Sequence, residues 1–135
     1  MQRADTQTIS IDAPRDVVLD LVGDPLALPR WAPAFAGTIR PGGDAWIVDT
    51  GDGELRIDVR VSREFGTVDF LAAGLPPGVE IGAFSRVVAN GRGCDYAFTQ
   101  FLAPGATADE VARRRAVVAD ELEAVRRLCC EPSAA

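Results

Sequence analysis

Between Phe35 and Leu102 the sequence divides into short stretches of alternating apolar and polar residues, separated by glycine- and proline-rich turns. The turns are Pro41-Gly42-Gly43, Gly51-Asp52-Gly53, Gly66, Pro76-Pro77-Gly78 and Asn90-Gly91-Arg92-Gly93. Alternation with a period of two is typical of strands that bury one face, and short turns between such strands favour antiparallel pairing. The pattern therefore predicts an antiparallel meander of about six strands.

The residues before the meander are predicted to form a strand and two short helices. Residues Gln7–Ile11 alternate weakly, which favours a short strand. Asp12 and Pro14 then indicate a helix over Pro14–Val22, because an acidic side chain can cap a helix and proline suits its first turn. A Gly-Asp-Pro sequence ends this helix, and Leu26–Trp31 can form one further helical turn.

The C-terminal part has the pattern of one long helix. It is predicted over Ala108–Cys129, where Thr107 and Glu110 have the spacing of a capping box. The apolar residues fall on one narrow stripe at helical spacing: Val111, Val118, Leu122, Val125 and Cys129. Arg114 and Arg115 flank this stripe, so one of them can reach an apolar surface that the helix covers; alternatively, both keep their charged groups in water.

The pairing expected in three hairpins indicates which face of the sheet is buried. The last hairpin, with Asn90 opposite Gly93, aligns Val87 with Tyr96, Ser85 with Phe98, Ala83 with Gln100 and Ile81 with Leu102. The hairpin before it aligns Val61 with Val68, Val59 with Phe70, and Arg60 with Asp69 as an outward ion pair. A turn at Asp52-Gly53 aligns Asp49 with Arg56 and places Trp46 and Val48 on the side of Leu55 and Ile57. All three hairpins place large apolar side chains on one concave face.

Residue types that are absent exclude several classes of function. The 135-residue chain has no histidine, and none of its 14 basic residues is a lysine, which excludes Ser-His-Asp triads, His-containing zinc sites and lysine Schiff bases. Its net charge of −6 has the wrong sign for binding nucleic acid. No apolar run is long enough to span a membrane. We therefore expect a cytoplasmic protein that is not an integral membrane protein and needs no metal or cofactor.

The cysteines and the chain length bear on compartment and domain organisation. Cys94, Cys129 and Cys130 are odd in number and lack CxxC spacing, which favours small buried reduced thiols over a disulfide framework. A redox role for the adjacent pair is the alternative. The length fits one domain, predicted over residues 1–130, with residues 131–135 as a frayed tail.

The N-terminal part also resembles a known superfamily. The run Ile9–Val18, continued by Leu21–Pro25 and Leu28–Trp31, contains an Ala-Pro helix start followed by an Asp-Pro pair and a tryptophan. This sequence, with the predicted order of elements over residues 5–129, resembles the SRPBCC (START-like) superfamily, which includes polyketide cyclases and lipid-transfer domains. The resemblance implies the α+β helix-grip fold, in which a curved antiparallel sheet of about seven strands wraps around a long C-terminal helix, with two short helices after strand one.

The resemblance further implies a deep apolar cavity between the sheet and the long helix. The candidate ligand-binding residues are Trp31, Trp46, Ile57, Val59, Phe70, Ser85, Tyr96, Phe98, Gln100, Arg115, Val118 and Leu122. Tyr96, Ser85 and Gln100 are polar, so they either orient a mainly apolar ligand or satisfy each other and nearby backbone groups. No carboxylate is placed on the inner face, so the sequence indicates no general base and no catalytic residue is assigned.

The leading functional hypothesis is noncovalent binding of a small hydrophobic molecule, such as a lipid, an isoprenoid or an aromatic polyketide. Two alternatives stay open. One is a polyketide cyclase or dehydratase that uses the same cavity, and the other is a non-catalytic protein-interaction domain with a filled core. A homodimer is compatible with all three hypotheses.

Overall fold

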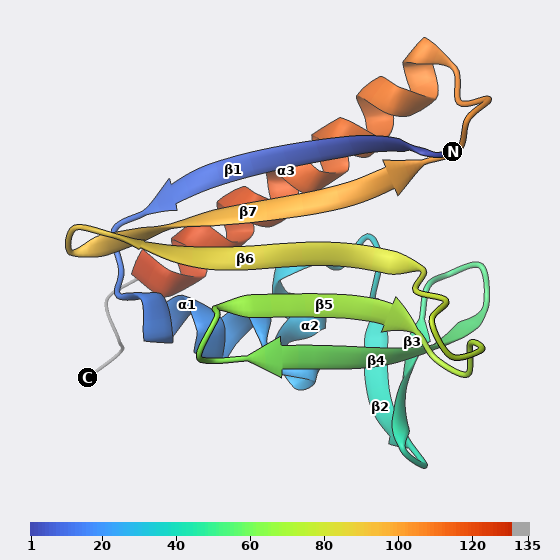
Figure 1. Cartoon of the computed structure of the whole chain (residues 1–135), viewed down its shortest axis with the longest axis horizontal. Helices are drawn as coiled ribbons and strands as arrows, with labels where there is room; N and C mark the ends of the chain where they lie inside the picture. The colour runs from blue at the N-terminus through green and yellow to red at the C-terminus, as the bar shows by residue number, and fades with distance from the viewer. Residues whose placement is uncertain (131–135) are drawn as a thin grey trace.

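The computed structural model describes residues 1–130, which form one antiparallel sheet with its helices on one side (Figure 1). In chain order the elements are β1 (Arg3–Ile11), α1 (Arg15–Val22), the 3₁₀ turn η1 (Pro25–Ala27), α2 (Leu28–Trp31), β2 (Thr38–Gly42), β3 (Ala45–Asp49), β4 (Glu54–Ser62), β5 (Thr67–Ala72), β6 (Gly82–Asn90), β7 (Gly93–Leu102) and α3 (Ala108–Cys130). The strand order is β1-β7-β6-β5-β4-β3-β2. The predicted α+β class, the meander and the long C-terminal helix are confirmed; the predicted tail at 131–135 lies outside the described residues.

The N-terminal elements occur in the predicted order, with two differences at their ends. Strand β1 begins at Arg3, four residues before the predicted start, because its pairing with β7 continues to Arg3 opposite Leu102. Pro14 occupies the N-cap position of α1 and no side chain caps this helix, so the prediction of Asp12 as the cap is wrong. The side-chain cap in this region is on the next element: Asp24 caps η1 by accepting a hydrogen bond from the backbone N–H of Leu26 at 3.0 Å.

The β6–β7 hairpin confirms the predicted register over most of its length. Asn90 lies opposite Gly93, Val87 opposite Tyr96 and Ser85 opposite Phe98. The two outermost predicted pairs are wrong, because pairing ends at Phe84 opposite Thr99. Beyond that point β7 follows β1 to Leu102, while β6 follows β5. Ala83 therefore does not pair with Gln100, nor Ile81 with Leu102, and the two strands separate at this end of the sheet.

A close approach between β5 and β6 explains why β6 begins with glycine. A Cβ atom on Gly82 would lie 1.8 Å from the carbonyl oxygen of Phe70, so no larger residue fits without moving the backbone. Ile81, directly before it, leaves the sheet and is 57% exposed. The strand β6 therefore turns toward β5 and away from the end of β7.

The other two hairpins keep the predicted faces but differ in detail. Strands β4 and β5 pair as predicted, yet Arg60 forms its ion pair with Glu80 at 2.8 Å and not with Asp69. Asp49 lies opposite Glu54 and not opposite Arg56, a shift of two residues. Because side chains alternate with a period of two, this shift leaves Trp46 and Val48 on the predicted inner face.

Helix α3 begins with the predicted capping box and packs through its second half. The Thr107 hydroxyl accepts from the Glu110 backbone N–H at 3.2 Å, and the Glu110 carboxylate accepts from the Thr107 N–H at 3.4 Å. The buried residues are Val118, Glu121, Leu122, Ala124 and Val125. The helix lies along β1 and against α1 and α2, so its second half closes the inner side of the sheet.

Candidate functional site between the sheet and the C-terminal helix

Four of the predicted site residues form a continuous aromatic row on the inner side of the fold. The ring centroids of Trp31 and Phe70 are 5.8 Å apart, those of Phe70 and Phe98 6.3 Å, and those of Phe98 and Tyr96 6.4 Å. All four side chains are buried. Trp31 enters from α2, whereas the other three come from β5 and β7. The row, hereafter the aromatic row, therefore connects the short helices with the centre of the sheet.

The two hydroxyl groups predicted on this face are hydrogen-bonded to each other. The Tyr96 hydroxyl donates to Ser85 Oγ at 3.0 Å, and Ser85 Oγ donates to the backbone oxygen of Val68 at 2.7 Å. Burial raises the pKa of Tyr96 above its ordinary value; the hydrogen bond to Ser85 opposes this shift, and the nearby charge of Glu121 adds to it. Tyr96 is therefore protonated at neutral pH, and its oxygen still has lone pairs that can accept a hydrogen bond.

Glu121 is a buried carboxylic acid that the sequence analysis missed. Its side chain comes from α3, is 9% exposed and is close enough to Tyr96 for the two groups to interact electrostatically. No residue in the described range 1–130 forms a hydrogen bond or ion pair with it. Burial raises the pKa of Glu121 to about 7, the charge of Arg114 lowers it, and that of Asp120 raises it. The expectation that no carboxylate faces inward is therefore wrong.

The spacing of α3 contains the signal that identifies Glu121. It lies three residues after Val118 and four before Val125, so it falls on the buried side of the helix. A glutamate in a helix is usually predicted to face solvent, because removing an unpaired charge from water costs on the order of several kcal/mol. The raised pKa is the way in which such a group avoids that cost.

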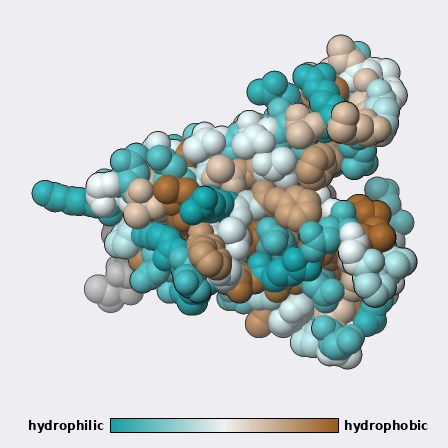
Figure 2. All heavy atoms as spheres, viewed as in Figure 1, coloured by the Kyte–Doolittle hydropathy of each residue, from teal (hydrophilic) through white to brown (hydrophobic). Residues whose placement is uncertain are grey.

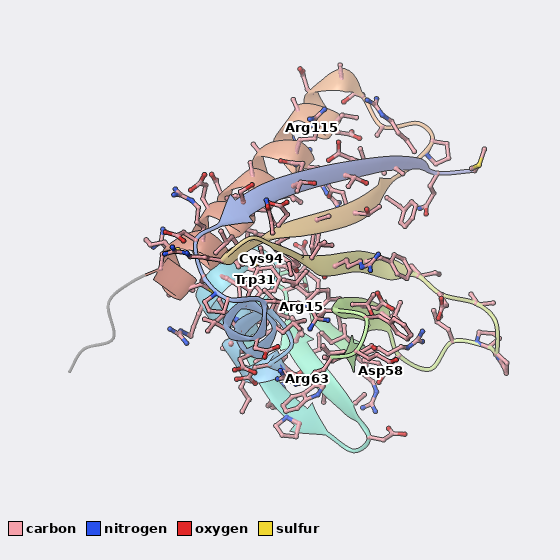
Figure 3. The ribbon with its side chains drawn as sticks, turned by 60° about the vertical axis from the view of Figure 1, so that its left-hand side comes forward. Arg15, Trp31, Asp58, Arg63, Cys94 and Arg115 are labelled. Carbon is pink, nitrogen blue, oxygen red and sulfur yellow. The ribbon has the colours of Figure 1, made fainter. Side chains whose placement is uncertain are left out.

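A second polar group lies farther along the inner face and fastens β1 and β7 to α3. Asp5 is 9% exposed, and its carboxylate lies 3.3 Å from Nε of Arg115 and 3.3 Å from Nε2 of Gln100. Gln7 donates to the backbone oxygen of Arg115 at 2.9 Å, and Gln100 donates to that of Arg114 at 3.4 Å. Arg115 thus reaches the edge of the inner face, where it forms an ion pair with Asp5. Figure 3 shows Arg115 on α3.

The remaining predicted residues divide by burial. Ile57, Val118 and Leu122 are buried, whereas Trp46 and Val59 are half-buried and pack against the same core. The structure thus brings the apolar members of the predicted set to one side of the sheet. Arg115, with a side chain 52% exposed, lies at the margin of this set.

Trp31 has a buried polar atom that lacks a partner. Its indole Nε1 forms no hydrogen bond with any group of residues 1–130, although the residue is only 2% exposed. Figure 3 shows Trp31 in the interior, on the helical side of the sheet. Leaving a buried donor unpaired costs about 1–3 kcal/mol, so this N–H has an unused capacity to bind an acceptor.

Two surface hollows lie outside the predicted lining. One, of about 140 Å³, is bounded by Leu102, Ala103, Ala106, Glu110, Arg113 and Arg114. The other, of about 330 Å³, is bounded by Ser10, Ile11, Asp12, Asn90, Arg92, Gly93 and Cys94. Neither contains a residue of the aromatic row, so a closed ligand cavity there stays a prediction.

Residues 1–130 contain neither a cluster of metal-ligating side chains nor a helix suited to spanning a membrane. No group of three or more His, Cys, Asp or Glu side chains among them is arranged to hold a metal ion. None of the helices in this range is both long enough and apolar enough to cross a membrane.

Comparison with known proteins identifies the fold. No protein-family model matches the chain, and no curated protein matches it in sequence. An uncharacterised protein from Bacillus thuringiensis superposes with a TM-score of 0.72 at 14% identity, over 96% of this chain and 100% of that one. The Aha1 dimer from Colwellia psychrerythraea gives 0.69 at 18% identity, over 94% and 96%. The ZhuI aromatase/cyclase from Streptomyces sp. R1128 gives 0.62 at 16% identity, over 96% and 98%.

Identities this low establish a common fold and leave the activity open. These structures superpose on this chain over nearly their whole length. The chain therefore shares one fold with them, the antiparallel sheet and long C-terminal helix of the helix-grip fold.

Proposed function

We propose that this chain binds a small, mainly apolar molecule with a hydrogen-bond acceptor, between the inner face of the sheet and α3. The observation that carries the proposal is the unpartnered Nε1–H of Trp31 at one end of the aromatic row. A carbonyl or hydroxyl oxygen of a ligand would accept this hydrogen bond and remove the cost of the unpaired donor. Aromatic side chains with a few convergent polar groups are typical of small-molecule sites. The likeness to an aromatase/cyclase supports the same assignment.

The end of the sheet where β6 and β7 separate offers a route to this site. Pairing stops at Phe84 opposite Thr99, and Ala83, next on the inner face of β6, is only half-buried. Figure 2 shows the molecular outline indented between the start of α3 and the opposite side of the sheet. The first turn of α3, before the contacts of Arg114 and Arg115 with the sheet, is mostly exposed, so it can move with little loss of packing. A ligand reaches the aromatic row from this end by displacing the start of α3.

A second candidate function is a cyclase or dehydratase reaction in the same place, and Glu121 favours it. A general base works best when its pKa lies near the working pH, and that of Glu121 is about 7. Glu121 would remove a proton from a carbon next to a ketone, and Tyr96 would turn its hydroxyl from Ser85 Oγ to donate to the ketone oxygen. In this reaction both groups act on one substrate, whereas simple binding needs only the hydrogen bonds.

The experiment compares two probes of the same shape, 2-acetylnaphthalene, which has a ketone, and 2-ethylnaphthalene, which has no acceptor. Isothermal titration calorimetry should show that the wild-type protein prefers the ketone by about 2- to 10-fold, the value of one hydrogen bond. Trp31→Phe keeps an aromatic ring but removes the N–H, so this preference should disappear. Trp46→Phe, at the half-buried second tryptophan, is the matched control and should retain the preference.

Native mass spectrometry of the protein as purified provides an independent test, because a bound apolar molecule would add its own mass. Binding of neither probe, together with a ligand-free mass, would favour the protein-interaction alternative with a filled core. Equal binding of both probes to wild type and Trp31→Phe would show that the indole N–H does not contact the ligand.

A further inference from the structure

All three cysteines of the chain meet at one end of the fold. Cys94 lies on the inner face of β7, opposite Ile11 of β1, and is 1% exposed. Cys129 is half-buried and packs against the core cluster that contains Cys94. The Cys130 thiol donates to the backbone oxygen of Asp12 at 3.6 Å. Figure 1 shows this end of α3 beside the β6–β7 turn and the end of β1. Residues 94 and 130 are thus far apart in sequence but close in the fold.

The three thiols differ in their exposure. Burial raises the pKa of Cys94, with smaller contributions from Asp95 and Cys130. Burial also raises the pKa of Cys129 to about 11, with smaller contributions from the other two thiols. Cys130 is exposed and lies one helical turn after Arg126, whose positive charge interacts with it. The thiolate is the reactive form of cysteine, and reaction also needs access. Cys130 is therefore the thiol that an oxidant meets first.

The same end of the fold contains the larger surface hollow. Asp12, whose carbonyl accepts the Cys130 thiol, lines it together with Cys94. The hollow brings solvent to the edge of β7, where Cys94 lies. A small oxidant in this hollow lies beside Asp12, the residue whose backbone oxygen accepts the Cys130 thiol.

We propose that Cys130 and Cys94 form an oxidation-sensitive pair, in which a peroxide oxidises Cys130 and Cys94 then forms a disulfide with it between β7 and the end of α3. In the first step the Cys130 thiolate attacks one peroxide oxygen, the O–O bond breaks, and hydroxide leaves. The sulfur is oxidised to sulfenic acid as the peroxide is reduced. In the second step the Cys94 thiolate attacks the Cys130 sulfur and the S–O bond breaks. The hydroxide released combines with the Cys94 proton to form water.

Geometry favours Cys94 over Cys129 as the partner of Cys130. Adjacent residues have Cα atoms about 3.8 Å apart, closer than the roughly 4.4–6.8 Å usual across a disulfide. A Cys129–Cys130 bond would therefore distort the last turn of α3. Cys94 belongs to a different element, and the end of a helix can fray enough to bring Cys130 to it. The resulting bond fixes α3 to the sheet.

The test is treatment of the reduced full-length protein with hydrogen peroxide, followed by mass mapping of its peptides without reduction. We expect a Cys94–Cys130 linkage and a rise in melting temperature of roughly 5–15 °C, as for a disulfide that closes a long loop. Cys130→Ser, at an exposed position, should abolish both results. Cys129→Ser is the matched control and should retain them. Cys94→Ala should leave Cys130 as a sulfenic acid that dimedone captures.

Three results would overturn the proposal. The first is a Cys129–Cys130 or Cys94–Cys129 bond, the second is a disulfide between two copies of the chain, and the third is further oxidation of Cys130 without any linkage. Dimedone labelling of wild-type protein at short times gives a readout that does not depend on the folding of the Cys94 variant.

Discussion

Asp5 and Glu121 are both carboxylates with 9% exposure on the inner side of the fold, yet their surroundings differ. Asp5 has Arg115 at 3.3 Å and accepts hydrogen bonds from the amides of Gln7 and Gln100. Glu121 has no such partner within residues 1–130, and burial raises its pKa to about 7. Asp5 therefore stabilises the attachment of α3 to β1. The ionised form of Glu121 instead destabilises the fold, and its carboxyl group titrates near neutral pH.

The largest expected change in the free energy of unfolding is at Glu121. Its pKa rises from 4.5 to about 7 on folding, so its neutral form stabilises the protein below pH 4.5 and this contribution is lost as pH rises through 7. Glu121→Gln removes the charge and should stabilise the protein at pH 8 by up to about 3 kcal/mol. At pH 4 the difference from wild type should be small. Urea unfolding at both pH values measures it; equal stability at pH 8 would show that Glu121 is hydrated.

Replacing Asp5 is expected to destabilise the protein, the opposite of the effect at Glu121. Asp5→Asn keeps the size of the side chain but removes the anion that Arg115 and the two amides bind. The variant should lose about 1–2 kcal/mol of unfolding free energy at neutral pH, because buried hydrogen bonds to a charged group are the stronger kind. Urea unfolding at pH 7 measures this change. A stabilised Asp5→Asn variant would remove the distinction between the two carboxylates.

A Tyr96→Phe variant distinguishes ligand binding from catalysis near Tyr96 and Glu121. Tyr96→Phe keeps the ring and removes one hydrogen bond, so affinity for a ligand with an oxygen at the Tyr96 end of the aromatic row should fall by about 0.5–1.5 kcal/mol if Tyr96 only orients the ligand. If Tyr96 and Glu121 act on a substrate, turnover should fall by about 100-fold while affinity changes little. Calorimetry and a turnover assay separate these outcomes. Unchanged affinity and turnover would limit the hydroxyl to its bond with Ser85.

The smallest effect is expected at Arg115. Its side chain is 52% exposed, so its ion pair with Asp5 is screened by water. Arg115→Gln should cost about 0.5 kcal/mol, and the loss should shrink at high salt. Arg113→Gln is the matched control on the same turn of α3. A cost as large as that of Asp5→Asn would mean that the ion pair, and not the amide hydrogen bonds, stabilises this attachment.

The sequence predicts the fold well where local turn chemistry sets the pairing. Asn90–Gly93 fixes the β6–β7 register and with it the places of Ser85, Tyr96 and Phe98. The glycines around Asp52 allow more than one turn, so the β3–β4 register is missed by two residues while the faces are right. Glu80 lies in a connection, where strand alternation gives no information about ion-pair partners.

The site is less predictable, because its polar groups depend on contacts between distant elements. Asp5 is missed because the predicted strand starts after it, although the same alternation extended backward reaches it. Glu121 is missed because a charged residue on a helix is assigned to solvent by default. The unpaired indole N–H of Trp31 depends on which acceptors surround α2 in the folded chain, and no sequence pattern reports that.

The most direct test of the proposed binding site is the ¹⁵N–¹H NMR signal of the Trp31 indole N–H. Trp46 supplies the other indole signal of the chain and serves as the internal control. Addition of 2-acetylnaphthalene should move the Trp31 signal downfield and slow its exchange with solvent, because the N–H then donates to the ketone. The same concentration of 2-ethylnaphthalene should not produce this downfield shift. A Trp31 signal that stays in place at a saturating concentration of the ketone would contradict the proposed site.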